Sequence, residues 1–113
     1  METTRQLKLA RQIQKDVGEI FEQELRGVFS GALITVTKVH VTKDLSIARV
    51  YFSLFGVQNK KDLLEKVKTH KPEIRYHLGN RIRKQVRSIP DLEFFEDDSL
   101  DYIENIERLL KNG

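Results

Sequence analysis

The sequence predicts a single α+β domain with the element order αββααβ, in which helices cover one face of a three-stranded sheet. Two runs rich in β-branched residues follow an N-terminal helical pattern, and a second helical region, interrupted by Pro72, precedes a short apolar strand pattern. Every predicted helix has one apolar stripe and only one sheet can receive them, so all stripes should pack on the same sheet face. The length of 113 residues suits one such core.

The first two elements are a helix and a strand. Over residues 5–26 apolar residues recur at steps of three and four and stop before Gly27, which predicts an amphipathic helix. The following run, LITVTKVHVT, predicts a strand over residues 33–42. Its apolar residues Ile34 and Val36 share one parity, whereas Val39 and Val41 share the other. Because alternate residues of a strand face the same side, we predict a β-bulge near Thr37 and Lys38.

The middle of the chain predicts a hairpin partner and a kinked helix pair. Residues 47–55, IARVYFSLF, alternate as a half-buried strand does, and residues 59–69 predict a second helix. Pro72 cannot continue that helix, because proline lacks the amide hydrogen, yet it suits the first turn of a new helix. Two helices should therefore meet at a kink at His70-Lys71-Pro72.

The third helix is predicted to run to Arg87, with an apolar stripe and an opposite polar side. The stripe consists of Ile74, Leu78, Ile82 and Val86. The polar side carries Tyr76, Asn80, Arg83, Lys84 and Arg87.

The end of the chain predicts a short strand over residues 92–95 and then a terminal helix. Ser99 is its predicted cap, and its apolar residues are Leu100, Ile103, Ile106 and Leu110. We expect one domain over residues 1–113, with a core over about 5–97 and an acidic helical extension over about 98–113.

Composition excludes several classes of protein. With no cysteine, disulfides, thiolate metal sites and cysteine nucleophiles are absent, and the chain suits a reducing cytoplasm. Basic residues interrupt the N-terminus where a signal peptide would be apolar, and no apolar run is long enough to span a membrane. We expect a cytoplasmic monomer that binds no membrane.

The net charge of +3 conceals a strong asymmetry. Residues 1–26 are neutral and residues 27–67 carry +3, but residues 68–89 carry +6 and residues 90–113 carry −6. We expect the positive charge to be concentrated around the bend between the second and third helices, where it can meet phosphates. The alternative is that the acidic end of the chain folds over this basic segment and neutralises it.

A helix pair joined at a tight break, with basic residues around the break, is how K-homology domains hold a nucleic-acid backbone. Those domains normally use a GXXG turn, and no two glycines here are three residues apart. The match to K-homology domains is therefore architectural.

Longer stretches resemble one family more closely. The segments RQLKLARQIQKDVGEIFEQEL, ITVTKVHVTKDLSIARVYFSLFG, EIRYHLGNRIRKQVR and SIPDLEFFEDDS are similar, in this order and spacing, to bacterial ribosome-binding factor A. The most specific pieces are Asp44-Leu45 before Ala48 and Val50-Tyr51, the pairs Ile74-Arg75 and Leu78-Gly79, and Pro90-x-Leu92-x-Phe94-x-x-Asp97.

The resemblance implies a type II K-homology fold that binds the small ribosomal subunit and its rRNA during late maturation. It also implies a role in 16S rRNA processing, an association with cold adaptation, and no catalytic turnover. Family members typically have an Ala-x-Gly kink where this chain reads His70-Lys71-Pro72.

The candidate RNA-binding residues are basic residues of the kink, the third helix and the first helix. They are Lys68, His70, Lys71, Arg75, Arg81, Arg83, Lys84, Arg87, Arg5, Lys8 and Arg11. For Arg75, which falls beside the apolar stripe, a structural role at the core edge is an equal alternative. The others alternatively form an ordinary solvated surface.

Catalysis has little support in the sequence. The three histidines lack metal-ligand spacings, and no glycine-rich nucleotide loop is present. We therefore predict a binding protein without metal, cofactor or small-molecule substrate. One alternative is a protein-interaction adaptor that uses the open sheet face or the terminal helix, and another is a general single-strand RNA binder.

Overall fold

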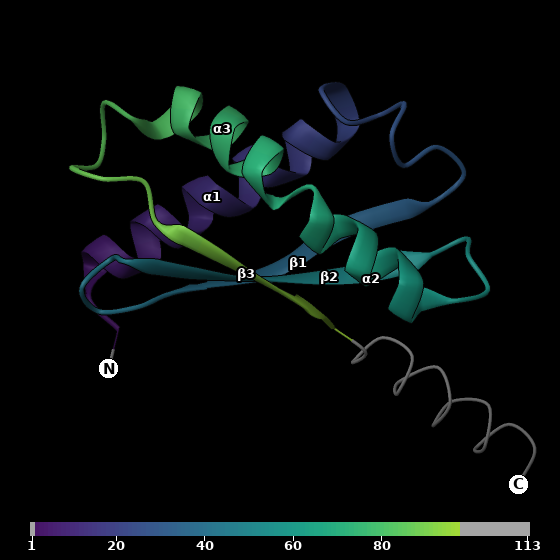
Figure 1. Cartoon of the computed structure of the whole chain (residues 1–113). Helices are drawn as coiled ribbons and strands as arrows, with labels where there is room; N and C mark the ends of the chain where they lie inside the picture. Colours follow the sequence, from purple (N-terminus) through teal and green to yellow (C-terminus); the bar gives the residue numbers. More distant parts are fainter. Residues whose placement is uncertain (1, 98–113) are drawn as a thin grey trace, which may run out of the picture.

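The computed structural model describes residues 2–97 and has one sheet with helices over one of its faces (Figure 1). The elements are α1 Thr4–Gln23, β1 Leu33–Val41, β2 Ile47–Phe55, α2 Lys60–Thr69, α3 Lys71–Ile82 and β3 Asp91–Glu96. The predicted order αββααβ is confirmed. The predicted terminal helix over residues 99–110 lies outside the described residues.

The first helix begins at a capping box, in which the Gln6 amide donates to the Thr3 hydroxyl and the Thr3 amide donates to the Gln6 side chain. Its apolar stripe is buried against the sheet as predicted. The helix ends at Gln23, three residues before Arg26, because the Leu25 amide donates to the Ile20 carbonyl and turns Leu25 into the core.

The sheet has the order β1-β2-β3, with β1 and β2 antiparallel and β2 and β3 parallel. The pairing of β1 with β2 shifts between Val36 and Lys38, which confirms the predicted β-bulge. The shift buries both Val36 and Val41 on the helix side of the sheet although they differ in parity.

The second and third helices meet at His70, which is at once the C-cap of α2 and the N-cap of α3. Pro72 occupies the first turn of α3, so the kink forms where the sequence predicted it. The buried residues of α3 are Ile74, Leu78 and Ile82, which hold the helix on the core.

Aromatic packing joins the two layers at the centre of the core. The Phe52 ring from β2 lies 5.4 Å from Phe21 of α1 and 5.5 Å from Phe94 of β3, and Phe52 is fully buried. Aromatic rings at this spacing add packing energy to the area that they bury. This core fixes α1 and α3 on the sheet and so sets the positions of the charged side chains that these helices carry.

Candidate nucleic-acid interface

Three segments that are far apart in the sequence meet at one end of the molecule, on the left in Figure 1. They are the start of α1, the turn between β1 and β2, and residues 83–90 between α3 and β3. The Gln6 side-chain amide donates a 2.9 Å hydrogen bond to the Val41 carbonyl, which joins α1 to the end of β1. The Asp91 amide donates a 2.9 Å hydrogen bond to the Ser46 carbonyl, which joins the start of β3 to the turn. The charges of all three segments therefore share one surface.

Charge is segregated along α1. Residues 4–15 carry four exposed basic side chains and no acid, whereas the acids follow from residue 16 onward. The basic residues are Arg5, Lys8, Arg11 and Lys15, and the acids are Asp16, Glu19, Glu22 and Glu24. A net charge taken over the whole helix hides this division.

The third helix ends at Ile82, so the prediction that it continues to Arg87 is wrong. The Arg75 guanidinium donates to the Ile89 carbonyl at 2.8 Å and to the Pro90 carbonyl at 3.1 Å, which holds the returning chain beside α3. A helix continued to Arg87 would run about 18 Å past Arg75 and leave about 10 Å of extended chain for the return. The chain must therefore turn earlier.

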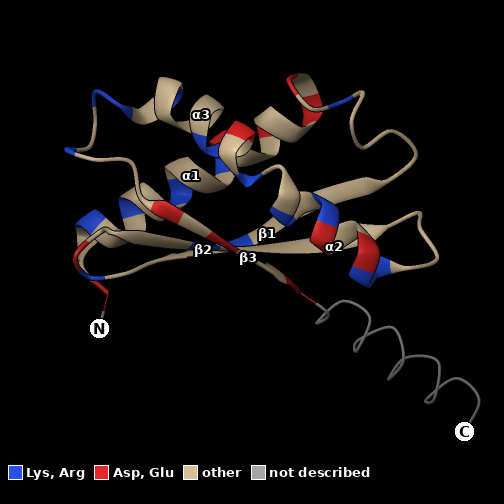
Figure 2. Ribbon diagram, viewed as in Figure 1, with Lys and Arg blue, Asp and Glu red and all other residues tan. Residues whose placement is uncertain are grey.

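Arg83, Lys84 and Arg87 consequently lie on the connection to β3 and not on one side of a helix. All three side chains are exposed, and none of them makes a hydrogen bond or ion pair with any residue of the described part of the chain. With the basic residues of α1 and Lys43 of the hairpin turn they form a surface that we call the basic end (Figure 2). Its members are Arg5, Lys8, Arg11, Lys15, Lys43, Arg83, Lys84 and Arg87.

Two acids near the basic end are held by neighbouring polar groups. The Asp44 carboxylate accepts hydrogen bonds from the Ser46 hydroxyl at 2.7 Å and the Thr42 hydroxyl at 2.8 Å, and these bonds lower the pKa of Asp44. Glu2 lies 2.6 Å from the His40 ring. Asp44 thus stabilises the hairpin turn through its bonds to Thr42 and Ser46. Leu45, between them, has a positive φ of 63°.

The basic residues at the bend between α2 and α3 have local partners. Lys68 lies 3.6 Å from Glu65, and Lys71 lies 3.1 Å from Asp91. His70 donates from its ring to the Lys66 carbonyl at 2.9 Å. The sequence predicted that positive charge is concentrated at this bend; in the structure Lys68 and Lys71 have local acidic partners, whereas Arg83, Lys84 and Arg87, beyond the other end of α3, have no ionic partner among residues 2–97. Exposed pairs are worth at most about 1 kcal/mol, so Lys68 and Lys71 can still turn to a phosphate.

We expect replacement of Lys71 by alanine to raise the pKa of Asp91 toward its ordinary value of 3.8. The hydrogen bond from Lys71 is the largest cause that lowers the pKa of Asp91. A carboxyl with a lowered folded pKa contributes stability above its unfolded pKa and loses it as pH falls through the folded pKa. The Lys71→Ala variant should therefore lose less stability than the parent as the pH falls through the pKa of Asp91. An NMR titration of the Asp91 carboxyl measures it, with Lys68→Ala as control, and an unchanged titration of the Lys71 variant would contradict the pairing.

Arg81 is surrounded by acids of α1 and is set apart from the other predicted site residues. Its guanidinium contacts Glu19 at 2.5 Å, Glu24 at 3.3 Å and Asp16 at 3.4 Å. Asp16 is 4% exposed and also accepts a 2.8 Å hydrogen bond from Gln12. Burial lowers the pKa of Arg81, but the bonds to Glu19 and Glu24 outweigh it and raise the pKa overall. The positive charge of Arg81 is neutralised by acids of the protein itself, so Arg81 is not a member of the basic end.

Arg75 is also engaged within the protein, since it holds residues 89 and 90 beside α3. Of the two alternatives for this residue, the structural role is therefore the one that its contacts support. Its side chain nevertheless lines, together with Arg83, a hollow on α3.

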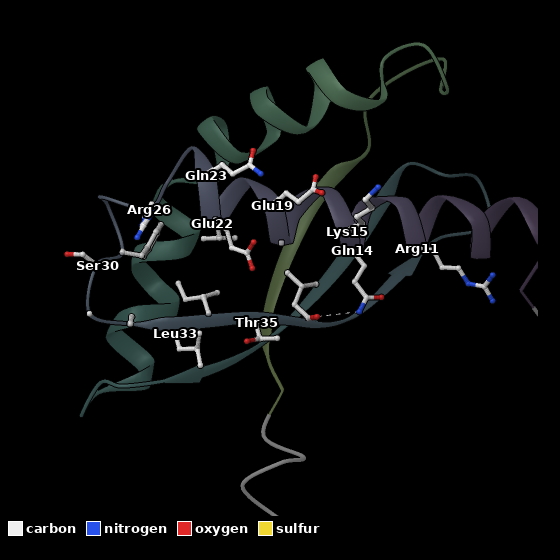
Figure 3. Close-up of a pocket in the computed structure, with 17 residues that line it drawn as sticks. Arg11, Gln14, Lys15, Glu19, Glu22, Gln23, Arg26, Ser30, Leu33 and Thr35 are labelled. Carbon is white, nitrogen blue, oxygen red and sulfur yellow. Dashed lines mark hydrogen bonds between the residues drawn. The ribbon is translucent and has the colours of Figure 1, made fainter.

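A large open groove of about 1130 Å³ lies between α1 and β1 (Figure 3). Gln14 reaches from α1 to β1, where its amide donates to the Val36 carbonyl at 3.3 Å. Its charged lining residues are two bases that it shares with the basic end, Arg11 and Lys15, then the acids Glu19 and Glu22, and finally Arg26. Because its charges are mixed, the groove is less suited to a polyanion than the basic end.

Over residues 2–97 no group of three or more His, Asp or Glu side chains is placed to hold a metal ion. Within the same range, the helices lack the length and hydrophobicity that a membrane span requires.

Reasoning from the sequence missed two members of the basic end, Lys15 and Lys43. The signal for Lys15 was available, because a charge count that stops before Asp16 gives a strongly basic first half of the helix. Lys43 gave no such signal. Its proximity to the start of α1 depends on the contact between Gln6 and Val41.

Comparison with known proteins gives a consistent family. The family model described as "Ribosome-binding factor A" matches residues 5–110. The chain is 48% identical to ribosome-binding factor A of Flavobacterium johnsoniae, over 97% of this chain and 85% of that protein. It is 47% identical to ribosome-binding factor A of Prosthecochloris aestuarii, over 94% of this chain and 86% of that protein.

Solved structures give the same fold. The crystal structure of ribosome-binding factor A from Thermus thermophilus superposes with a TM-score of 0.64 at 24% identity, over 79% of this chain and 92% of that one. A homology model of the Thermus thermophilus factor, fitted into a cryo-EM map of a 30S complex of that factor, superposes with a TM-score of 0.61 at 26% identity. It covers 79% of this chain and 91% of that chain.

Proposed function

The chain belongs to the ribosome-binding factor A family, and on that premise we propose that it binds the small ribosomal subunit during late maturation. The basic end contacts phosphates of the rRNA, and the factor acts without chemical turnover. The observation that carries this proposal is that eight exposed basic side chains from three segments gather at one end and have no ionic partner among residues 2–97.

Unpaired cations on a rigid surface favour a polyanion for a physical reason. Each cation that neutralises a phosphate releases a condensed counterion, and this release supplies affinity that depends on salt and not on sequence. The fold supplies the specificity, because the spacing of cations on α1 and on residues 83–90 is fixed by the core and suits a folded RNA of matching shape.

We further propose that one copy acts as a single K-homology-like domain over residues 1–113, with a core over about 5–97 and an extension over about 98–113. Its binding assists 16S rRNA processing by stabilising a late folding state of the subunit. The site of action is the cytoplasm, and the family's association with cold fits a factor that stabilises RNA structure during slow assembly. Lys68, His70 and Lys71 at the bend form a secondary contact.

The test is sedimentation of the tagged protein with free small subunits and with whole ribosomes over a series of salt concentrations. If about six cations meet phosphates, the log–log plot of affinity against salt should have a slope of about −4 to −5. We expect association with free small subunits and little with whole ribosomes. A flat salt dependence contradicts the proposal.

Nuclease treatment separates this function from the adaptor alternative. A complex that rests on rRNA phosphates is lost when RNA is digested, whereas a complex with a protein partner survives. A partner retained by the protein after complete digestion would favour an adaptor.

A further inference from the structure

A small hollow lies on the solvent side of α3, where the chain returns toward β3. Its volume is about 450 Å³, within the range of small-ligand sites, and it is lined by Tyr76, Asn80, Arg83, Gly79, Ile89 and Pro72 among others. It adjoins the basic end, since Arg83 belongs to both.

The most prominent side chain of the hollow is Tyr76, which is 67% exposed. Within the described part of the chain its one ring contact is an edge approach to His77, with ring centres 5.5 Å apart and planes at 70°. An edge contact leaves a ring face uncovered. A large exposed aromatic ring beside unpaired cations is the combination on which single-stranded nucleic acids stack their bases.

Tyr76, Asn80 and Arg83 stand on successive turns of one side of the helix, because they are spaced by four and three residues. Arg83 still has helical backbone angles as the C-cap of α3, so this alignment holds to the end. The side chains of Asn80 and Arg83 are exposed and have no hydrogen-bond partner among residues 2–97. The row offers a ring, an amide with donor and acceptor, and a planar cation.

The floor of the hollow is apolar and is held in place. Ile89 packs on α3 beside Gly79, where a Cβ would lie at an ordinary contact distance of 3.4 Å from the Ile89 Cγ1. The Ile89 carbonyl in turn accepts the 2.8 Å hydrogen bond from Arg75. Contacts within the protein therefore hold the floor of the hollow, and the exposed side chains of Tyr76, Asn80 and Arg83 stand around it.

We propose that this hollow takes one unpaired base of the RNA, with Tyr76 stacking on the base. The Asn80 amide forms hydrogen bonds with the edge of the base, and Arg83 contacts the adjoining phosphate. The inference rests on the proposed function and names what that same surface recognises. An RNA base fits the hollow better than an apolar peptide side chain, because Arg83 and the nearby cations Lys84 and Arg87 can bind the phosphates on either side of the base.

The first test measures affinity for small subunits after replacement of Tyr76. Loss of one base stack by Tyr76→Ala should weaken binding by about 5- to 150-fold and leave the salt slope unchanged, because no cation is removed. Tyr76→Phe keeps the ring and should bind within about threefold of the parent. Arg83→Gln should lower the magnitude of the salt slope by about one. Normal binding by Tyr76→Ala overturns the base site.

The second test identifies the occupant by ultraviolet cross-linking of the protein to small subunits, followed by digestion of RNA and protein. Trypsin cuts after Arg75 and Arg81, so the peptide of residues 76–81 should carry a nucleotide adduct at Tyr76. Cross-linking of this peptide to a ribosomal protein overturns the base site. Adducts confined to peptides of the basic end also overturn it but leave the proposed function standing. A flat salt dependence of binding would instead contradict both the base site and the proposed function.

Discussion

Replacing Arg83, Lys84 and Arg87 together by glutamate is expected to abolish association with the small ribosomal subunit and to leave the fold intact. The three side chains are exposed and bind nothing in the described part of the chain, so their replacement removes no contact of the core. If each reversal costs about one factor of ten, the affinity falls by about a thousandfold. Co-sedimentation at fixed salt measures the loss, and thermal unfolding checks the fold.

A matched pair of variants separates the position of the charge from its amount. Arg83→Glu with Arg87→Glu changes the net charge by the same amount as Arg26→Glu with Lys61→Glu. Arg26 and Lys61 are also exposed and without an ionic partner among residues 2–97, but Arg26 follows the end of α1 and Lys61 lies at the start of α2, on the opposite side of the molecule in Figure 1. We expect only the first pair to lose binding. Equal losses would mean that total charge, and not this surface, governs association, and normal co-sedimentation of the triple variant would refute the site.

The fold was predictable where local chemistry decides it. Pro72 alone places the kink at His70, and the change of parity between Val36 and Val39 alone places the β-bulge. The end of α3 was not predictable in this way. The spacing of Val86 continues the apolar stripe, but the return of the chain to pair with β2 overrides it, and Arg75 fixes that return.

The candidate site was only partly predictable, because a sequence gives the charge of a side chain and not its partner. Arg83, Lys84 and Arg87 keep the exposure that the sequence predicted, although their helical alignment was wrong. Arg81 looks equivalent to Arg83 in the sequence, yet the packing of α3 on α1 surrounds it with acids from more than fifty residues away. Only the tertiary structure separates these two arginines.

Arg81 accordingly gives the second large effect, which we expect in stability and not in recognition. Arg81→Ala leaves the buried Asp16 carboxylate with Gln12 as its remaining partner and removes the cation from Glu19 and Glu24. Removing one partner of a fully buried ion pair costs about 3 to 5 kcal/mol. Because Arg81 keeps 24% of its side-chain exposure, we expect a loss of about 2 to 3 kcal/mol in the free energy of unfolding, measured by urea denaturation.

The control uses the acid that Arg81 neutralises. Asp16→Asn alone should lower the free energy of unfolding by less than Arg81→Ala does. The double variant should lower it by less than the sum of the two single variants, which corresponds to a coupling energy of about 1 to 2 kcal/mol. Lys84→Ala, a neighbouring exposed cation, should leave stability within about 0.5 kcal/mol of the parent. At a temperature where every variant is folded, Arg81→Ala should bind small subunits far better than the triple glutamate variant. Parent-like stability combined with a tenfold or greater loss of affinity would return Arg81 to the RNA surface and contradict its role as the cation that holds α3 on α1.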